Sequence, residues 1–169
     1  MKKLRKIATV LCLCLVAALS ICACGKTNTK EAAEGSKDKP LSFELASGKG
    51  TISVYVDNDK YKLEANKDSK NSMSVLTPDD KVVNMVFNTL DADKLKKVKK
   101  LDEYKETEIN KQFAFYASPN ASTAASEDEV EHDLLVQIGK SDTYLCIIQY
   151  GKDVSVLDEV AKVVKCEIE

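Results

Sequence analysis

Six cysteines and one histidine are the residues of this chain best suited to covalent, redox or metal chemistry. Four of the cysteines lie within the first 24 residues, which leaves only Cys146 and Cys166 further along. Two cysteines allow at most one disulfide, and each can instead be a small buried apolar residue. We favour separate thiols, because Cys146 falls inside an expected strand and Cys166 at the end and rim of an expected helix.

His132 lies in an acidic stretch, residues 127–133, where carboxylates and an imidazole together have the chemistry to hold a cation. Two thiols and one histidine, however, do not reproduce a zinc spacing. No serine–histidine–aspartate order carries a nucleophile elbow, and no glycine-rich phosphate loop occurs. The simpler interpretation of residues 127–133 is a solvated loop. We therefore expect no enzyme activity, no metal and no cofactor.

The first 24 residues have the pattern of an export signal. Four basic residues within positions 2–6 precede an apolar run from Ile7 to Ala23. That run is too short for a comfortable membrane span, and a charged start followed by such a run is typical of a secretory signal. The run closes on Ile21-Cys22-Ala23-Cys24, and this motif resembles the lipobox of bacterial lipoprotein precursors. The resemblance covers about one seventh of the chain.

The lipobox resemblance implies that Cys24 is joined to diacylglycerol and that residues 1–23 are then removed. Cys22 is the alternative acceptor, but Ile21 would then precede the cut, where a small side chain is needed. The resemblance places the mature protein at the cell membrane, anchored by lipid and facing outside the cytoplasm. It says nothing about what the protein does there.

The composition limits the partners of the mature chain. Over the whole sequence, 25 basic residues stand against 27 acidic ones, and four of the basic residues lie in the signal. The mature chain therefore has a net charge of about −6, and its basic residues are all lysines because Arg5 is the only arginine. An acidic domain without the planar arginine fork is poorly suited to nucleic acid. We expect a monomer whose partners are the membrane, through its lipid, and an unknown protein or cell-wall component.

Three regions follow from the distribution of apolar residues. Residues 1–23 are the signal, and residues 24–40 combine the lipidated cysteine with a flexible tether that has almost no large apolar side chain. Residues 41–169 are long enough for one domain with a modest core.

The first half of the domain is predicted to contain strands and one helix. Alternating apolar residues indicate strands at 41–46, 51–56 and 61–65, the last two forming a hairpin, and a further short strand at 73–76. Thr77-Pro78-Asp79-Asp80 has the form of a helix start. Val82, Val83, Val86, Phe87 and Leu90 then recur at helical spacing.

The second half is predicted to end in two strands and a helix. Residues 91–101 are ambiguous, and their lysines either contact an anionic wall polymer or lipid or are simply solvated. A strand at 109–117 and an acidic mobile loop at 118–131 follow. Residues 134–138 and 144–150 are predicted to form an antiparallel pair, and 155–164 a final helix.

These elements predict an α+β fold, with an antiparallel sheet packed against two or three helices. The expected function is that of a non-enzymatic binding or accessory domain at the cell surface. One alternative is a protective or inhibitory protein that blocks an exogenous hydrolase or toxin. The other is an enzyme that uses an acidic pair or His132.

Overall fold

The structure is a computed structural model, and it describes residues 34–45, 50–101 and 103–169. The expected signal and Cys24 lie outside these ranges. Within these ranges, eleven strands form two sheets, and every pair of neighbouring strands is antiparallel. The large sheet has the order β1 (Glu34–Gly35), β4 (Lys62–Ala65), β5 (Ser72–Leu76), β6 (Val82–Thr89), β10 (Thr143–Tyr150), β9 (Glu131–Gln137), β8 (Gln112–Ala117), β7 (Lys105–Ile109). The small sheet has the order β11 (Val164–Ile168), β3 (Thr51–Val56), β2 (Leu41–Glu44).

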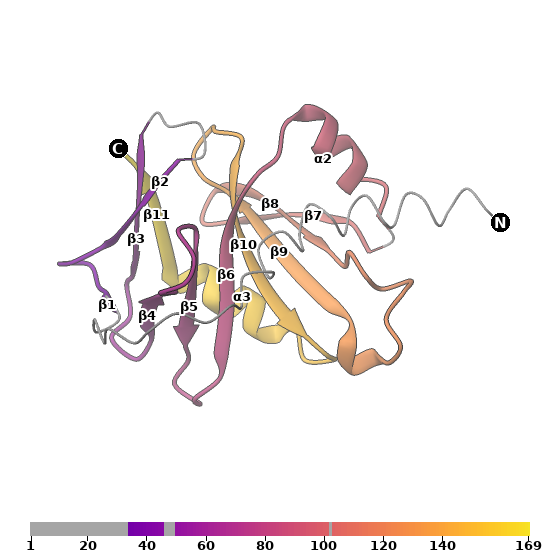
Figure 1. Ribbon diagram of the computed structural model, residues 1–169, viewed down its shortest axis with the longest axis horizontal. Coiled ribbons are helices and arrows are strands. Elements are labelled where there is room, and N and C mark those ends of the chain that lie inside the picture. The colour runs from indigo at the N-terminus through magenta and orange to yellow at the C-terminus, as the bar shows by residue number, and fades with distance from the viewer. Residues whose placement is uncertain (1–33, 46–49, 102) are drawn as a thin grey trace.

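Two α-helices and one 3-10 turn complete the described ranges: α2 (Ala92–Val98), α3 (Ser155–Val163) and η2 (Glu127–Glu129). Helix α3 contacts β9 and β10 of the large sheet and β11 of the small one (Figure 1). Within the described ranges, neither helix is long and apolar enough to cross a membrane.

The main core lies where the two sheets and α3 meet. Its members alternate along each strand, as expected for strands with one face turned to this core. Leu145 and Ile147 of β10 belong to it, together with Leu157 and Val160 of α3 and Ile52 of β3. A second apolar cluster lies on the opposite face of the large sheet. It contains Val86, Phe115, Ala117, Leu135, Tyr144 and Cys146, and Leu95 and Val98 of α2 pack against it.

The predicted helix over residues 82–90 is wrong, because these residues form β6, in the interior of the large sheet. Val83 and Met85 are buried on the face toward α3, and Val86 is buried on the face toward α2. A strand covered on both faces carries apolar residues on both sides, and such a run imitates helical spacing.

The residues read as a helix start are the turn between β5 and β6. Thr77 N–H donates to the carbonyl of Lys81 at 2.9 Å, and the Lys81 N–H donates to Thr77 Oγ1 at 3.1 Å. Asp80 takes the left-handed conformation that such a turn needs, with φ of 61°. The same Thr, Pro and Asp residues are favoured in both structures, so the motif alone did not decide between them.

The predicted hairpin of residues 51–56 and 61–65 is also wrong, because β3 belongs to the small sheet and β4 to the large one. The strands themselves exist, but β3 pairs with β2 and β11, and β4 pairs with β1 and β5. Strands that follow one another in sequence pair often, but not always.

Several predicted elements are confirmed, with changes at their ends. Residues 73–76 lie in β5, the 134–138 and 144–150 segments pair as β9 and β10, and α3 covers most of the predicted final helix. The predicted strand at 109–117 is two strands, since Asn110 and Lys111 form the turn between β7 and β8 with φ of 50° and 65°. Residues 91–101 contain α2, whose first turn is capped by the Asp91 carboxylate.

Part of the predicted tether is built into the sheet. Glu34 and Gly35 form β1 and pair with β4, and Ser36 bridges to Val56 of β3. A Cβ atom at Gly35 would lie 2.7 Å from a methyl carbon of Leu63, so only glycine fits here without a shift. The chain therefore joins the fold before residue 41.

The α+β prediction is contradicted, since the protein is mostly β, with two antiparallel sheets and two α-helices in the described ranges. Two changes account for this. Residues 82–89 are a strand instead of a helix, and residues 164–168 leave α3 to form β11 beside β3.

Candidate functional site

Helix α3 has an opening at each of its ends. At the C-terminal end lies a cleft of about 460 Å³ between the two sheets, bordered by Ala161 and Val164. At the N-terminal end lies a second cavity of about 400 Å³, bordered by Val154, Ser155 and Asp158. The first is called the cleft and the second the polar cavity below.

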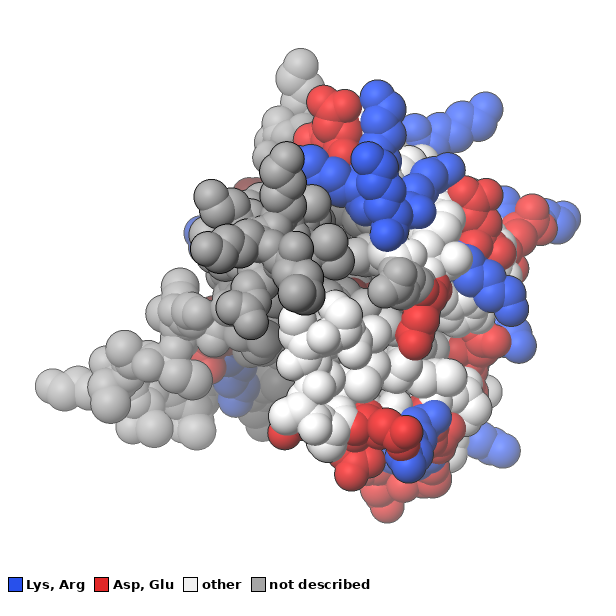
Figure 2. Space-filling view, turned by 90° about the vertical axis from the view of Figure 1, so that its right-hand side faces the viewer, with Lys and Arg blue, Asp and Glu red and all other residues white. Residues whose placement is uncertain are grey.

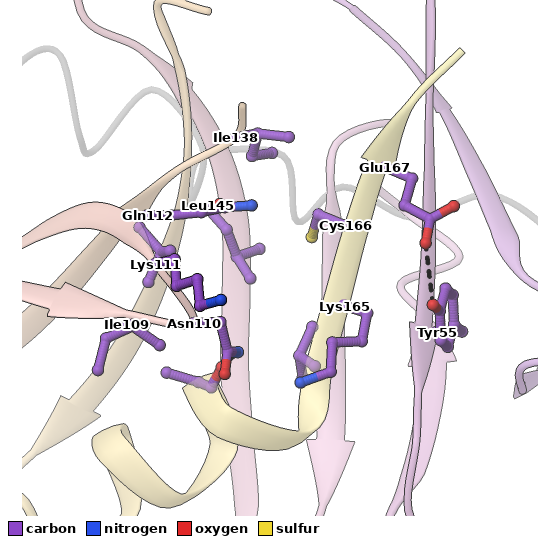
Figure 3. A pocket seen from close by; sticks show the side chains of 13 residues that line it. Tyr55, Ile109, Asn110, Lys111, Gln112, Ile138, Leu145, Lys165, Cys166 and Glu167 are labelled. Atoms are coloured by element: carbon purple, nitrogen blue, oxygen red, sulfur yellow. Dashed lines mark hydrogen bonds between the residues drawn. The ribbon is translucent and has the colours of Figure 1, made fainter. Parts of the chain in front are cut away.

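The cleft has an apolar floor. Val136, Ile138 and Leu145 line it from β9, β10 and the turn between them, and Cys166 lines it from β11. Cys166 points from β11 toward Leu145, and the β7–β8 turn lies across the opening (Figure 3). The volume is within the range of pockets that hold small ligands, and such pockets are mostly apolar.

The rim of the cleft is polar and held by hydrogen bonds. Tyr55 donates its hydroxyl to Glu167 at 3.0 Å, and Asn110 Nδ2 donates to the carbonyl of Ala161 at 3.2 Å. Lys165 forms an ion pair with Asp57 at 3.2 Å. These bonds tie the β7–β8 turn to the end of α3 and β11 to β3, so the cleft is a preformed feature of the fold.

The polar cavity contains the histidine that the sequence singled out. Ser118 Oγ lies 2.9 Å from His132 Nδ1, and it also donates to the carboxylate of Glu103. His132 Nδ1 is 3.7 Å from that carboxylate. Ser118 and His132 stand at the two ends of the 118–131 segment, and the pairing of β8 with β9 brings them together.

This cluster differs from a catalytic triad. In a triad the acid and the serine contact opposite nitrogens of the imidazole. Here Glu103 and Ser118 both lie at Nδ1, and among the described residues nothing hydrogen-bonds to Nε2. The serine hydroxyl gives its proton to Glu103 while it accepts from the ring. The arrangement therefore holds the loop ends together, and it does not present an activated nucleophile.

Two further polar residues border the same cavity, Tyr116 with its side chain toward α3 and Asp133 with its side chain on the opposite face of the sheet. Tyr116 donates its hydroxyl to Asp158 of α3, and burial together with this hydrogen bond raises the pKa of Tyr116 to about 12. Asp133 is 3% exposed, and its Oδ1 has no hydrogen-bond partner within the described ranges. Burial, assisted by the charge of Glu131, raises the pKa of Asp133 well above its usual value.

The acidic residues around His132 do not converge on one point. Glu127 pairs with Lys152, Glu129 accepts from the N–H of Ala125, and Glu131 accepts from the Tyr150 hydroxyl. His132 and Asp133 point to opposite faces because they are neighbours in a strand. Within the described ranges, no three histidine, cysteine or acidic residues lie together as metal ligands would.

Cys146 and Cys166 are free thiols. Cys146 belongs to the cluster on the α2 side of the large sheet, and Cys166 packs against the main core on the other side. Cys166 lies in β11 instead of at the rim of a helix, so the predicted location was wrong. Burial raises the pKa of Cys166 to about 12, and it raises the pKa of Cys146 as well.

The lysine-rich segment is partly neutralised. Three of its lysines are paired with carboxylates: Lys94 with Asp91 at 3.9 Å, Lys96 with Asp93 at 3.5 Å, and Lys99 with Glu106 at 2.8 Å. Figure 2 shows basic side chains gathered at the top of one face, with acidic side chains beside them. Exposed pairs of this kind contribute little to stability.

The sequence did not predict the cleft. Its lining comes from β3, the β7–β8 turn, β9, β10, α3 and β11, so no local pattern contains it. The one part of the cleft that the sequence could have indicated is the Asn110–Lys111 turn, because a polar pair that interrupts an alternating strand suggests a hairpin. The chain matches no protein-family profile, no curated protein and no solved structure.

Proposed function

We propose that the protein is a lipid-anchored, extracytoplasmic binding domain whose ligand site is the cleft. The observation that carries this proposal is the cleft's construction. An apolar floor of about 460 Å³ is surrounded by polar groups that already hold one another in place. Such a site supplies contact area and orientation, and its lining includes no arrangement of nucleophile, base and acid.

The location rests on the first 24 residues, where the basic start, the apolar run and the Ile21-Cys22-Ala23-Cys24 motif resemble a lipoprotein signal. The lipid on Cys24 would hold such a domain at the membrane. Cys22 remains the alternative acceptor.

Ligand binding in the cleft is tested with the full chain in phosphatidylcholine nanodiscs, using the fluorescent apolar anion 1-anilinonaphthalene-8-sulfonate. We expect saturable binding above the background of empty nanodiscs. Cys166→Phe fills the cleft and should reduce dye affinity about tenfold or more. Val82→Phe is the matched control, because it adds the same ring at a site that is 62% exposed and away from the cleft lining. Equal dye binding by both variants would contradict the proposal.

The anchor is tested by labelling cells with a palmitate analogue. Cys24→Ala should lose the label and either leave the membrane or accumulate as uncleaved precursor. Cys22→Ala is the control and should keep the label. Undiminished label on Cys24→Ala with loss of label from Cys22→Ala would transfer the lipid to Cys22, and absence of label from the wild type would remove the lipid anchor from the proposal.

A further inference from the structure

The edge of the small sheet that borders the cleft has no neighbouring strand. In the described part of the chain, β11 pairs with β3 on one side only. Its five residues span about 16 Å at the usual rise of a strand. An edge of this kind presents backbone donors and acceptors that are able to pair with another chain.

The register identifies which backbone groups are free. Thr51 and Glu169 exchange two hydrogen bonds, of 3.4 Å and 2.9 Å, and Asp57 N–H donates to the carbonyl of Val163. Hydrogen-bonded pairs recur at every second residue of an antiparallel ladder. Residues 165 and 167 therefore bond to β3, and the backbone groups of Cys166 and Ile168 point away from it.

One backbone N–H on this edge of β11 already has a hydrogen-bond partner within the protein. The N–H of Val164 donates to the carbonyl of Val160 and closes the end of α3. The remaining edge groups are the N–H and carbonyl of Cys166, those of Ile168, and the carbonyl of Val164. This set matches what one short extended segment would need from a neighbouring strand.

The cleft supplies the place for the side chains of such a segment. Side chains of a strand alternate between its two faces. Beside Cys166, one of those faces is the apolar floor formed by Ile138 and Leu145 (Figure 3). The other face is turned outward, where Glu167 is held by Tyr55.

The charge of Lys111 on the rim favours an acidic group on the ligand. Lys111 is exposed on the rim opposite β11, and within the described ranges it forms no ion pair, whereas Lys165 is paired with Asp57. A carboxylate on the ligand near Lys111 would be favoured, because opposite charges across a binding site aid association.

We propose that the ligand of the cleft is an extended peptide segment that adds to β11 as an antiparallel strand. Every second side chain of this segment is apolar and enters the cleft, and an acidic side chain lies beside Lys111. Main-chain hydrogen bonds to Cys166 and Ile168 give affinity, and the cleft gives side-chain selectivity. This inference rests on the proposed function, since it names the ligand class of the same site.

The test uses the full chain in labelled phosphatidylcholine nanodiscs and an array of random decapeptides. Bound peptides should alternate apolar and polar residues and should include an acidic residue. N-methylation of every second backbone amide of a bound peptide should reduce binding at least tenfold, because it removes the donors that face β11. N-methylation of the intervening amides should leave binding within about twofold.

Two variants of the same position separate backbone from side-chain effects. Cys166→Pro removes the edge N–H without disturbing the ladder to β3, a place where proline is tolerated. It should lose peptide binding and keep binding of 1-anilinonaphthalene-8-sulfonate. Cys166→Ala retains the N–H and should keep both.

Other outcomes overturn the inference in distinguishable ways. Dye binding without any peptide binding would mean that the cleft takes a compact ligand. Peptide binding that ignores N-methylation would exclude strand addition. Concentration-dependent pairing of nanodiscs that Cys166→Pro abolishes would assign the edge to a second copy of this chain. Failure of dye and peptide alike would overturn the proposed function itself.

Discussion

The two openings at the ends of α3 differ in how far their polar groups are satisfied by the protein itself. At the N-terminal end, Ser118 is shared between His132 and Glu103, and Tyr116 bonds to Asp158. At the C-terminal end, Tyr55, Asn110 and Lys165 of the rim also have partners. The neighbouring edge of β11, however, leaves backbone groups of Cys166 and Ile168 without a strand partner in the described ranges.

The difference teaches that cavity size alone does not indicate a binding site, because both openings have similar volumes. The side chains of the polar cavity join the segment before β7 to β8, β9 and α3, which is a structural role. The cleft combines an apolar floor with unused hydrogen-bonding capacity, and this combination suits a ligand.

Removing a wall of the polar cavity should have the largest effect. Leu157 is 1% exposed, lines that cavity and belongs to the main core, so Leu157→Ala should lower the free energy of unfolding by about 2–5 kcal/mol. Val154 lines the same cavity but is 39% exposed, so Val154→Ala should change it by less than about 0.5 kcal/mol. Urea unfolding of the full chain in detergent, followed by circular dichroism, measures both. Similar small effects would mean that α3 is not packed as described.

The two thiols report directly on access to the cleft. Cys166 should react with N-ethylmaleimide on the order of 100-fold faster than Cys146, which is fully buried and reacts only after local opening. Because the thiolate is the reactive form and the pKa of Cys166 is about 12, its rate should rise about tenfold per pH unit from pH 7 to 9. Peptide mass spectrometry gives both rates, and denatured protein is the control in which they should converge. Equal rates in the folded protein would show that the cleft does not admit small molecules.

Asp133 borders the polar cavity, but its carboxyl is buried on the α2 side of the large sheet, where Oδ1 has no partner among the described residues. Its pKa is higher in the folded protein than in the unfolded chain, so the folded state binds the proton more tightly. The contribution of Asp133 to the free energy of unfolding should therefore be greatest below about pH 4, the pKa of an unfolded aspartate. It should fall as the pH rises toward the pKa of Asp133 in the folded protein. Asp133→Asn has no ionisable group at this position and should therefore remove this pH dependence.

Asp128→Asn is the control for that measurement, because Asp128 is exposed in η2 and its loss should leave the slope unchanged. Thermal unfolding of the full chain in detergent between pH 4 and 8 provides the comparison. An Asp133→Asn variant whose stability falls with pH as steeply as the wild type would place the titrating group elsewhere.

The strands were predicted correctly where the order of apolar and turn residues had only one structural interpretation. The β9–β10 pair was predicted because an apolar run, a Gly139-Lys140-Ser141-Asp142 turn and a second apolar run leave little choice. Val82 to Leu90 failed because burial on both faces of β6 produced helical spacing, although three valines in this segment favour a strand.

The cleft lay beyond sequence reasoning for a different reason. It depends on β11 leaving the end of α3 and pairing with β3, more than one hundred residues earlier in the chain, as the Ile52–Ile168 register shows. Nothing local in residues 164–168 indicates this partner. His132 was identified as a candidate from its residue type, but its contact with Ser118 depends on the pairing of β8 and β9.

The smallest expected effect concerns the shared serine of the polar cavity. Ser118→Ala removes the hydroxyl that joins His132 and Glu103, and should lower the free energy of unfolding by about 0.5–1.5 kcal/mol. The effect is modest because the Glu103 side chain is 53% exposed and water can replace the lost bond. Ser122→Ala, at an exposed position of the same 118–131 segment, should be neutral. A hydrolytic activity that Ser118→Ala abolished while stability stayed unchanged would reverse the comparison, since the polar cavity would then be the functional opening.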